Sequence, residues 1–252
     1  MLEPKVLFKF LILVIVKNIF RLFYRFDVPM KQMASCEGRI DYSQVKMFII
    51  LNHTSLFEPV FLGSYSNRLL WQFAERFVFP VASKTMNNRL FNKIYSNMAS
   101  KTISVSRKRD ATWDHFLQQI DANSMVGIAP EGHMKRPNGL DSKGRPLVIR
   151  RGFIDVLEKI GDCKILVLYS HGLHHIQTPG EGFPKLFKRV SGRLELWSRD
   201  DFTTSAITKH PEANTDDSLV KFLTSRRDLF CKSTENSGKQ SSAEVITTVS
   251  TN

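Results

Sequence analysis

Two residue types suited to proton transfer stand close together in the segment NHTSLFE (residues 52–58). A neutral imidazole, with a reference pKa of about 6.5, can take a proton from a hydroxyl group near neutral pH. A carboxylate bonded to the other ring nitrogen fixes the tautomer and stabilises the imidazolium ion. We therefore predict that His53 is a general base and that Glu58 orients it. The alternative is a loop histidine that only hydrogen-bonds its neighbours.

Basic residues follow two other apolar segments. The sequence PEGHMKR (130–136) comes after one of them and RKR (107–109) after the other. Glycine allows close approach of the backbone to a ligand, and lysine and arginine suit a phosphate group. Taken singly, each cluster also fits an ordinary solvated surface.

From Val45 onward, short apolar runs alternate with helical stretches, which predicts an α/β layer fold. The predicted strands are Val45–Leu51, Leu69–Ala74, Thr102–Ser106, Met125–Ala129, Ile165–Ser170 and Arg193–Ser198. The predicted helices span residues 59–66, 88–99, 110–121, 153–160 and 216–230. Reactive groups of open α/β sheets gather where strands end, so the three polar segments are well placed for a common site.

The first 26 residues are strongly apolar but carry five cations. Their longest uninterrupted apolar run, Phe10–Val16, is too short for a membrane-spanning helix, which needs roughly 17–25 residues. Lys17, Arg21 and Arg25 recur every four residues and predict a basic stripe opposite an apolar side. We predict a membrane-surface helix here; a core helix whose lysines reach past apolar neighbours to water is the alternative.

Composition restricts the classes further. The chain has 252 residues, and its 42% hydrophobic and 24% charged residues exclude collagen-like, disulfide-scaffold and wholly disordered proteins. Its net charge of +12 favours polyanionic partners such as anionic lipid, nucleic acid or an acidic protein. Three widely separated cysteines indicate reduced thiols in the cytosol.

The fold class that we predict is one α/β domain with a mixed, mostly parallel central sheet flanked by helices and preceded by an interfacial helix. The predicted divisions are a surface helix over 1–26, a catalytic domain over 27–232 and a disordered tail over 233–252, which is polar and poor in aromatic residues.

The order and spacing of three segments resemble the motifs of the 1-acyl-glycerol-3-phosphate acyltransferase family. They are NHTSLFE (52–58), ISVSR (103–107) and APEG (129–132), and RRGF (150–153) resembles the segment that follows the third motif. The resemblance spans about residues 45–170. A single motif of this kind is weak, but the ordered set is fairly specific.

This resemblance implies roles for individual residues. His53 would activate the hydroxyl of the acceptor to attack an acyl thioester, and Glu58 stands where the family usually has aspartate. Arg107, Glu131 and Gly132 would hold the glycerol phosphate of the acceptor. Where the family has Thr-Arg, this chain has His133-Met134, so that the cations of this motif stand further along, at Lys135 and Arg136.

The activity implied by the resemblance is transfer of a fatty acyl group from acyl-CoA or acyl-carrier protein to a lysophospholipid during phospholipid synthesis. The first candidate acceptor is 1-acyl-glycerol-3-phosphate, and another lysophospholipid in remodelling is the alternative. No metal or redox cofactor is required. The expected location is the cytoplasmic face of the inner membrane, and the sequence does not fix the oligomeric state.

Three rival functions have weaker support. A nucleic-acid-binding protein would also be basic, but zinc-finger spacing, an RNA-binding signature and a clear recognition helix are missing from the sequence. HGLHH (171–175) suggests a metal site but has no cysteine or obvious carboxylate beside it. GSYSN (63–67) lacks the Gly-x-Ser-x-Gly elbow of a serine hydrolase.

Overall fold

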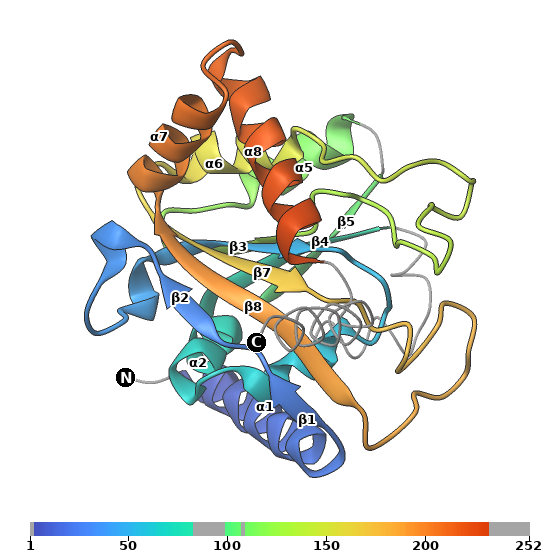
Figure 1. Ribbon diagram of the computed structural model, residues 1–252. Coiled ribbons are helices and arrows are strands. Elements are labelled where there is room, and N and C mark those ends of the chain that lie inside the picture. The colour runs from blue at the N-terminus through green and yellow to red at the C-terminus, as the bar shows by residue number, and fades with distance from the viewer. Residues whose placement is uncertain (1–2, 83–98, 107–108, 232–252) are drawn as a thin grey trace, which may run out of the picture.

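The computed structural model describes residues 3–82, 99–106 and 109–231. Within these ranges one sheet of eight strands has the order β1-β8-β7-β3-β6-β4-β5, and β2 also pairs with β8 (Figure 1). The strands are Arg25–Asp27 (β1), Met30–Gln32 (β2), Val45–Leu51 (β3), Phe77–Ala82 (β4), Lys101–Val105 (β5), Met125–Ile128 (β6), Lys164–Ser170 (β7) and Arg189–Ser198 (β8). Only β7 and β8 pair antiparallel among these described strands. The predicted mixed, mostly parallel sheet is confirmed.

Helices cover both faces of the sheet (Figure 1). On one face lie α1 (Pro4–Phe23), α2 (Asn67–Arg76) and the 3-10 helix η3 (Glu58–Ser64). On the other lie α5 (Ala111–Gln118), α6 (Gly152–Ile160), α7 (Arg199–Lys209) and α8 (Thr215–Phe230). Two short 3-10 helices, Ala34–Cys36 (η1) and Tyr42–Gln44 (η2), precede β3.

Strand β3 contributes to both layers, because successive side chains of a strand point to opposite faces. Met47, Ile49 and Leu51 are buried in the layer of α5, α6 and α8. Phe48 points the other way and packs against Phe73 of α2, with ring centroids 5.6 Å apart. Burial on both faces explains the nearly continuous apolar sequence of this strand, which ends where the loop of residues 52–58 begins.

The predicted strand Leu69–Ala74 is wrong, because these residues form the middle of α2. Ser66 caps the helix, and its Oγ accepts a hydrogen bond of 3.2 Å from the backbone NH of Leu69. The apolar residues of the segment recur at helical spacing and are buried on one side.

The neighbouring strand β4 was not predicted. It contains Pro80, which lies beyond the residues of β4 that pair with β6 and so removes no hydrogen bond from that pairing.

Most other predicted elements are confirmed, with shifted ends. The segment 59–66, predicted as a helix, is the 3-10 helix η3, and the sequence analysis missed β1, β2 and α7. Ser198 starts α7 directly after β8, because its Oγ accepts a hydrogen bond from the backbone NH of Asp201. Several predictions fall outside the described residues: the helix over 88–99 except Ala99, the contacts of Arg107, and the tail over 233–252.

The N-terminal segment is helical, as predicted, but its predicted basic stripe is wrong. Lys17 points inward, where its Nζ donates to Oδ1 of Asn67 over 2.8 Å. Arg25 lies beyond the helix, in β1. The exposed side of α1 is instead apolar and carries Phe8, Leu11, Ile15, Ile19 and Leu22.

Within the described ranges, no helix combines the length and the apolarity that crossing a bilayer requires. The division into residues 1–26, 27–232 and 233–252 stays a prediction.

Candidate active site

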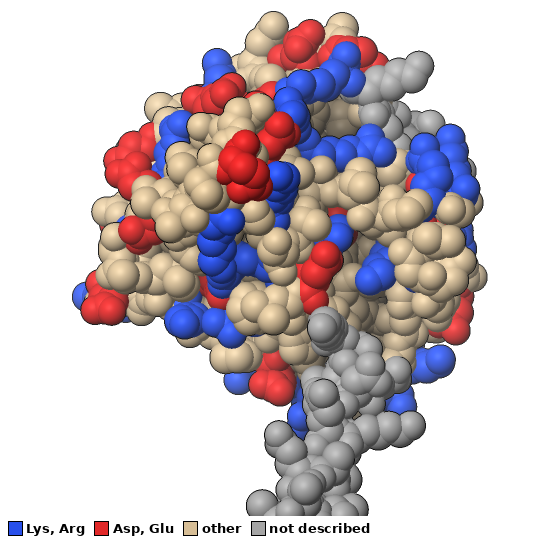
Figure 2. Space-filling view, turned by 45° about the horizontal axis from the view of Figure 1, so that its top comes forward, with Lys and Arg blue, Asp and Glu red and all other residues tan. Residues whose placement is uncertain are grey.

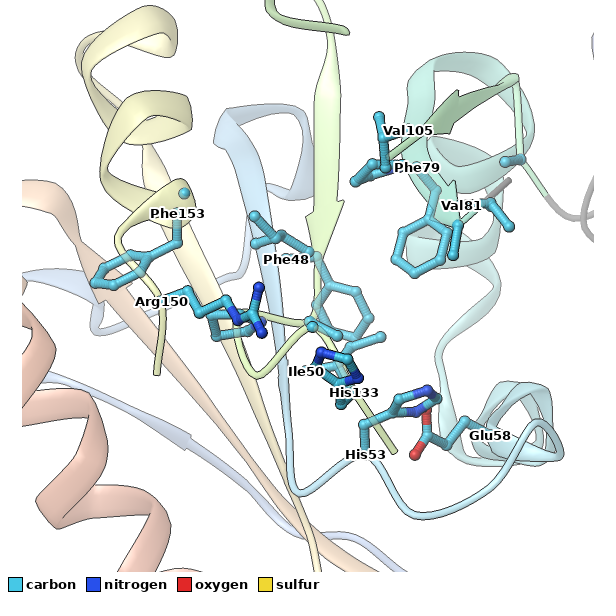
Figure 3. Close-up of a pocket in the computed structure, with 18 of the residues that line it drawn as sticks. Phe48, Ile50, His53, Glu58, Phe79, Val81, Val105, His133, Arg150 and Phe153 are labelled. Atoms are coloured by element: carbon cyan, nitrogen blue, oxygen red, sulfur yellow. The ribbon is translucent and has the colours of Figure 1, made fainter. Parts of the chain in front are cut away.

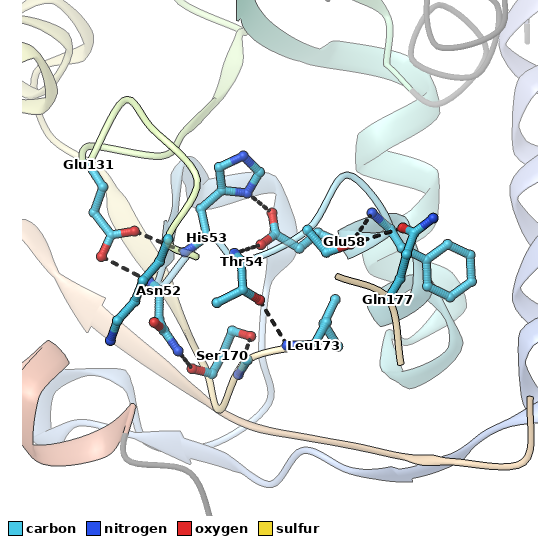
Figure 4. Close-up of polar contacts among 12 residues, drawn as sticks. Asn52, His53, Thr54, Glu58, Glu131, Ser170, Leu173 and Gln177 are labelled. Atoms are coloured by element: carbon cyan, nitrogen blue, oxygen red, sulfur yellow. Dashed lines mark hydrogen bonds and ion pairs between the residues drawn. The ribbon is translucent and has the colours of Figure 1, made fainter. Parts of the chain in front are cut away.

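The loop that follows β3 is held by hydrogen bonds to the ends of β6 and β7 (Figure 4). Asn52 has a left-handed φ of 62°, a conformation that asparagine adopts more readily than most residues. Its side-chain amide donates to the carbonyl of Ser170, at the end of β7, over 2.9 Å. The backbone NH groups of Asn52 and His53 donate to Oε1 and Oε2 of Glu131 over 3.2 and 2.9 Å. Three strand ends therefore share one polar network.

The structure brings the side chains of His53 and Glu58 together at this edge. Nδ1 of His53 is hydrogen-bonded to Oε2 of Glu58, while Oε1 of Glu58 accepts a bond of 2.9 Å from the backbone NH of Thr54. Both carboxylate oxygens are thus held, and the longer side chain of glutamate reaches the ring. Because Glu58 occupies Nδ1, Nε2 is the nitrogen that can exchange a proton with a substrate.

Glu131 holds the main chain of the histidine loop through its side-chain carboxylate. Its side chain is deeply buried, with a relative exposure of 2% for the residue, and Nη1 of Arg227 on α8 lies 3.5 Å from its Oε1. Burial raises the pKa of Glu131, whereas the hydrogen bonds from the two backbone NH groups and the charge of Arg227 act in the opposite direction. Both of its oxygens face the protein, so Glu131 holds the backbone at His53. The substrate-binding role that the family resemblance implies for it stays a prediction.

The turn after Glu131 places further groups near the histidine. Gly132 has a φ of 65°, and a Cβ there would lie 3.4 Å from Nε of Arg150. The buried ring of His133 has its Nδ1 3.9 Å from Oδ2 of Asp141. Hydrogen bonds from the backbone and side chain of Arg145 hold the pKa of Asp141 well below its usual range, so this carboxylate is charged beside His133.

A cavity of about 540 Å³ opens beside the histidine. Its lining includes the polar residues His53, Glu58, His133 and Arg150, which lie near one another in Figure 3. The rest of the lining is mostly apolar and comes chiefly from β3, β4, β5, β7, α2 and η3, with Phe48, Leu62, Phe73, Phe77, Phe79, Val81, Val105 and Leu168 among its members. The site therefore joins a polar end to an apolar pocket.

The structure does not bring the cations that were predicted to bind substrate together in the cavity, as far as it describes them. Arg107 lies outside the described residues. Lys135 donates its backbone NH to the carbonyl of His53 over 2.7 Å, and Arg136 is exposed on a turn. Neither is among the described residues that line the cavity. Arg109, the last residue of the RKR segment, does line it, and its Nε donates to Asp155 over 3.1 Å.

Arg150 and His133 are two polar lining residues to which sequence reasoning assigned no role. The backbone NH of Arg150 donates to the carbonyl of Pro130 over 2.9 Å, which ties the segment before α6 to the turn that carries Gly132. Two features of the sequence could have pointed to these residues. Arg150 is a cation just before the helix start at Gly152-Phe153, and His133 directly follows Glu131-Gly132. Neither feature shows, without the fold, that these side chains share a cavity with His53.

Comparison with known proteins identifies the chain. The model of the family described as Acyltransferase matches residues 35–170, which include the histidine loop and the turn of Glu131. The chain belongs to the Acyltransferase family. A search of curated proteins found no match. Among solved structures, the 1-acyl-sn-glycerophosphate (LPA) acyltransferase PlsC from Thermotoga maritima is similar, with 15% sequence identity and a TM-score of 0.47 over 83% of this chain and 77% of that chain.

The family determines the general chemistry, which is transfer of an acyl group. No group of three or more potential metal ligands occurs among the residues that the structure describes. Of the HGLHH segment, His174 and His175 each contact a backbone carbonyl through Nε2, of Lys135 and Arg189 respectively. The absence of a metal requirement stays a prediction.

The contacts of Glu131 predict a positioning role. In Glu131→Gln, an amide NH2 would face one of the two backbone NH groups that the carboxylate now accepts, and a buried donor would lose its partner. We expect kcat to fall by about 10- to 100-fold and the free energy of unfolding by about 1–3 kcal/mol, with KM for the acceptor nearly unchanged. Steady-state kinetics and urea denaturation measure these effects, with Glu212→Gln, an exposed glutamate, as the control. A large increase in KM at constant kcat would instead support the substrate-binding role.

The contact between His53 and Glu58 predicts different outcomes for two substitutions. Glu58→Gln keeps the length of the side chain but removes its charge, and we expect kcat to fall by about 10³- to 10⁴-fold, as for loss of charge in a histidine-carboxylate pair. Glu58→Asp keeps the charge but is one methylene shorter, so a smaller loss is expected. Equal losses in the two variants would show that the charge of this carboxylate does not matter.

Proposed function

We propose that the protein transfers a fatty acyl group from an acyl thioester to the free hydroxyl of a lysophospholipid, with 1-acyl-glycerol-3-phosphate as the first candidate. The observation that carries this proposal is the pairing of His53 with Glu58 beside a largely apolar cavity. A base held by a carboxylate suits activation of a hydroxyl, and an apolar cavity suits a fatty acyl chain.

In the proposed reaction, Nε2 of His53 takes the proton of the acceptor hydroxyl while the hydroxyl oxygen attacks the carbonyl carbon of the thioester. The carbon–sulfur bond then breaks, and the thiolate receives the proton from the imidazolium. Glu58 stabilises the imidazolium that exists between these two proton transfers. A positioned base contributes about 10²- to 10⁴-fold, and alignment of hydroxyl, imidazole and carbonyl contributes the rest.

The acceptor carries a phosphate, and we assign its binding to Arg150 with His133. Arg150 lines the same cavity as His53, and the neighbouring Gly132 leaves room for its side chain. Arginine binds phosphate through two parallel hydrogen bonds, which fixes orientation as well as position. Arg107, Lys135 and Arg136 remain candidates for the phosphate from the family resemblance.

The donor is proposed to be acyl-CoA or acyl-carrier protein, with no metal or redox cofactor.

The proposed location is the cytoplasmic face of the inner membrane, where α1 would lie on the lipid surface. Its exposed apolar side supports this, because an amphipathic helix in the interface buries its apolar face in the acyl region. On the face drawn in Figure 2, lysines and arginines lie among acidic residues. Nucleic acid is not a proposed partner.

The proposal is tested by offering the purified protein labelled acyl-CoA or acyl-carrier protein with a panel of lysophospholipids and identifying the products by mass spectrometry. We expect a diacyl product, formed fastest from 1-acyl-glycerol-3-phosphate. His53→Ala should lower kcat by at least about 10²-fold without changing the circular dichroism spectrum. Near-normal turnover in that variant would remove His53 from the mechanism, and absence of any product with the whole panel would contradict the proposed function.

The assignment of the phosphate to Arg150 predicts a change in KM. Charge-assisted hydrogen bonds contribute about 1.5–3 kcal/mol, so Arg150→Ala should raise KM for a phosphate-bearing acceptor by about 10- to 100-fold, and Arg150→Lys by less. Arg136→Ala is the comparison variant, because Arg136 is an exposed candidate for the same phosphate. If Arg136→Ala raises KM and Arg150→Ala does not, the phosphate lies at the exposed turn.

A further inference from the structure

The connection between β7 and β8 exposes large apolar side chains at its tip. The residue exposures are 91% for Phe183 and 74% for Phe187, and Leu186 between them is also exposed. Isolated exposed apolar residues are common, but several in one short loop mark a contact surface. Phe187 has a φ of 58°, which is a rare conformation for a bulky residue and costs about 1–3 kcal/mol.

Backbone and ring contacts fasten this tip to the end of α1. The backbone NH of Phe187 donates to the carbonyl of Phe23 over 2.8 Å, and their rings lie 5.9 Å apart. The backbone NH of Arg25 donates to the carbonyl of Lys188 over 3.1 Å. The loop therefore meets the last turn of α1, where Leu22 is 73% exposed (Figure 1). The exposed tip of the loop thus adjoins the exposed apolar side of α1.

Cations surround this shared apolar surface. The exposed lysines and arginines of these segments are Arg21, Arg25, Lys185, Lys188 and Arg189. Asp27 and Glu181 each lie 3.8 Å from one of these cations, in ion pairs whose side chains are all exposed. Such pairs are weak, and five cations against two carboxylates leave the area positive. Aromatic side chains among lysines and arginines are typical of segments that rest in the headgroup region of a membrane.

The base of the same loop contacts the proposed catalytic loop. The backbone NH of Leu173 donates to Oγ1 of Thr54 over 2.8 Å, and Oγ of Ser55 donates to Oε1 of Gln177 over 3.0 Å. The connection starts from the end of β7, which is the edge of the sheet that carries His53. One segment therefore links the exposed tip to the histidine loop.

We infer that the tip of residues 183–187 is a second membrane-inserting element, which acts with the apolar side of α1 to set the orientation of the protein on an anionic bilayer. The inference rests on the membrane attachment that belongs to the proposed function. Contact through the apolar side of one helix restrains rotation of the protein about the helix axis only weakly, whereas contact through a second element beside it fixes that rotation. The edge that carries His53 is then held at a set orientation to the surface where a lipid acceptor resides.

The charge and shape of this surface favour a bilayer over a second copy of the chain. A second copy would bring another set of cations against this one, whereas anionic headgroups attract them at about 1 kcal/mol per residue near the surface. The nearly complete exposure of Phe183 shows a projecting side chain, and a fluid acyl layer accommodates such a projection without a matching pocket.

The test measures binding of the full chain to vesicles of equal parts phosphatidylcholine and phosphatidylglycerol. Phe183→Gln and Phe187→Asn each remove an inserting ring, and asparagine tolerates the left-handed φ of residue 187. Partitioning should fall by about ten-fold or more in the double variant, since burial of one such ring contributes at least the ~1.4 kcal/mol that corresponds to ten-fold. Ile207→Gln is the matched control, because Ile207 is exposed on α7, across the sheet from α1.

A second measurement locates the tip directly. The fluorescence that Phe183→Trp adds to that of the three native tryptophans should be quenched by lipids brominated in their acyl chains, and not by water-soluble iodide once vesicles are present. Unchanged partitioning of the double variant, or a tryptophan that stays accessible to iodide on vesicles, would overturn the inference. A dimer that light scattering detects for the wild type and not for the double variant would also overturn it in favour of a second copy.

Turnover of a short-chain acceptor below its micelle concentration separates this inference from the proposed function. The double variant should match the wild type with this soluble acceptor and lose rate only with the acceptor in vesicles. If the wild type acylates neither acceptor, the proposed function fails, while vesicle binding still decides the role of the loop. Equal rates for variant and wild type in both formats would count against the loop alone.

Discussion

A buried carboxylate at the end of β6 accepts the backbone NH groups of two successive residues at the end of β3. This contact between Glu131 and the start of the histidine loop sets where the ring of His53 can lie. Glu58 then fixes how that ring is turned, because it is bonded to Nδ1 and its other oxygen is held by the backbone of Thr54. One acid positions the main chain and the other orients the side chain, so the geometry of the site depends on both.

The parallel sheet makes these contacts possible. The carboxyl ends of parallel strands meet at one edge, and β3 lies between β6 and β7. Asn52 reaches β7 through Ser170, while Glu131 comes from β6. On the other side of the sheet, Arg227 of α8 places its charge near Glu131. The site therefore draws on both layers of the fold, although it is reached through the apolar cavity on the side of α2.

The two ends of that cavity fit an amphiphile. Apolar side chains from β3, β4 and α2 can surround a hydrocarbon chain, and Arg150 with His133 offers positive and polar groups near His53, the proposed base. On the outside, the apolar side of α1 and the tip of residues 183–187 adjoin each other, and the latter segment also contacts the histidine loop. A protein that draws its acceptor from a lipid surface benefits from such a connection, since the orientation of its active edge to the surface then becomes fixed.

The sequence by itself determined the fold class, most of the strands and the pairing of His53 with a nearby acid. These features depend on local periodicity and short spacing: β3 is apolar because it is buried on both faces, and His53 and Glu58 share one loop. It did not determine α2, whose short apolar segment was predicted as a strand, or the direction of Lys17, which depends on the position of Asn67 on a neighbouring helix. Tertiary structure alone decided that Glu131 faces the backbone of His53 and that Arg150 shares its cavity. These contacts join residues far apart in the chain, and only the order of the strands brings them within hydrogen-bonding distance.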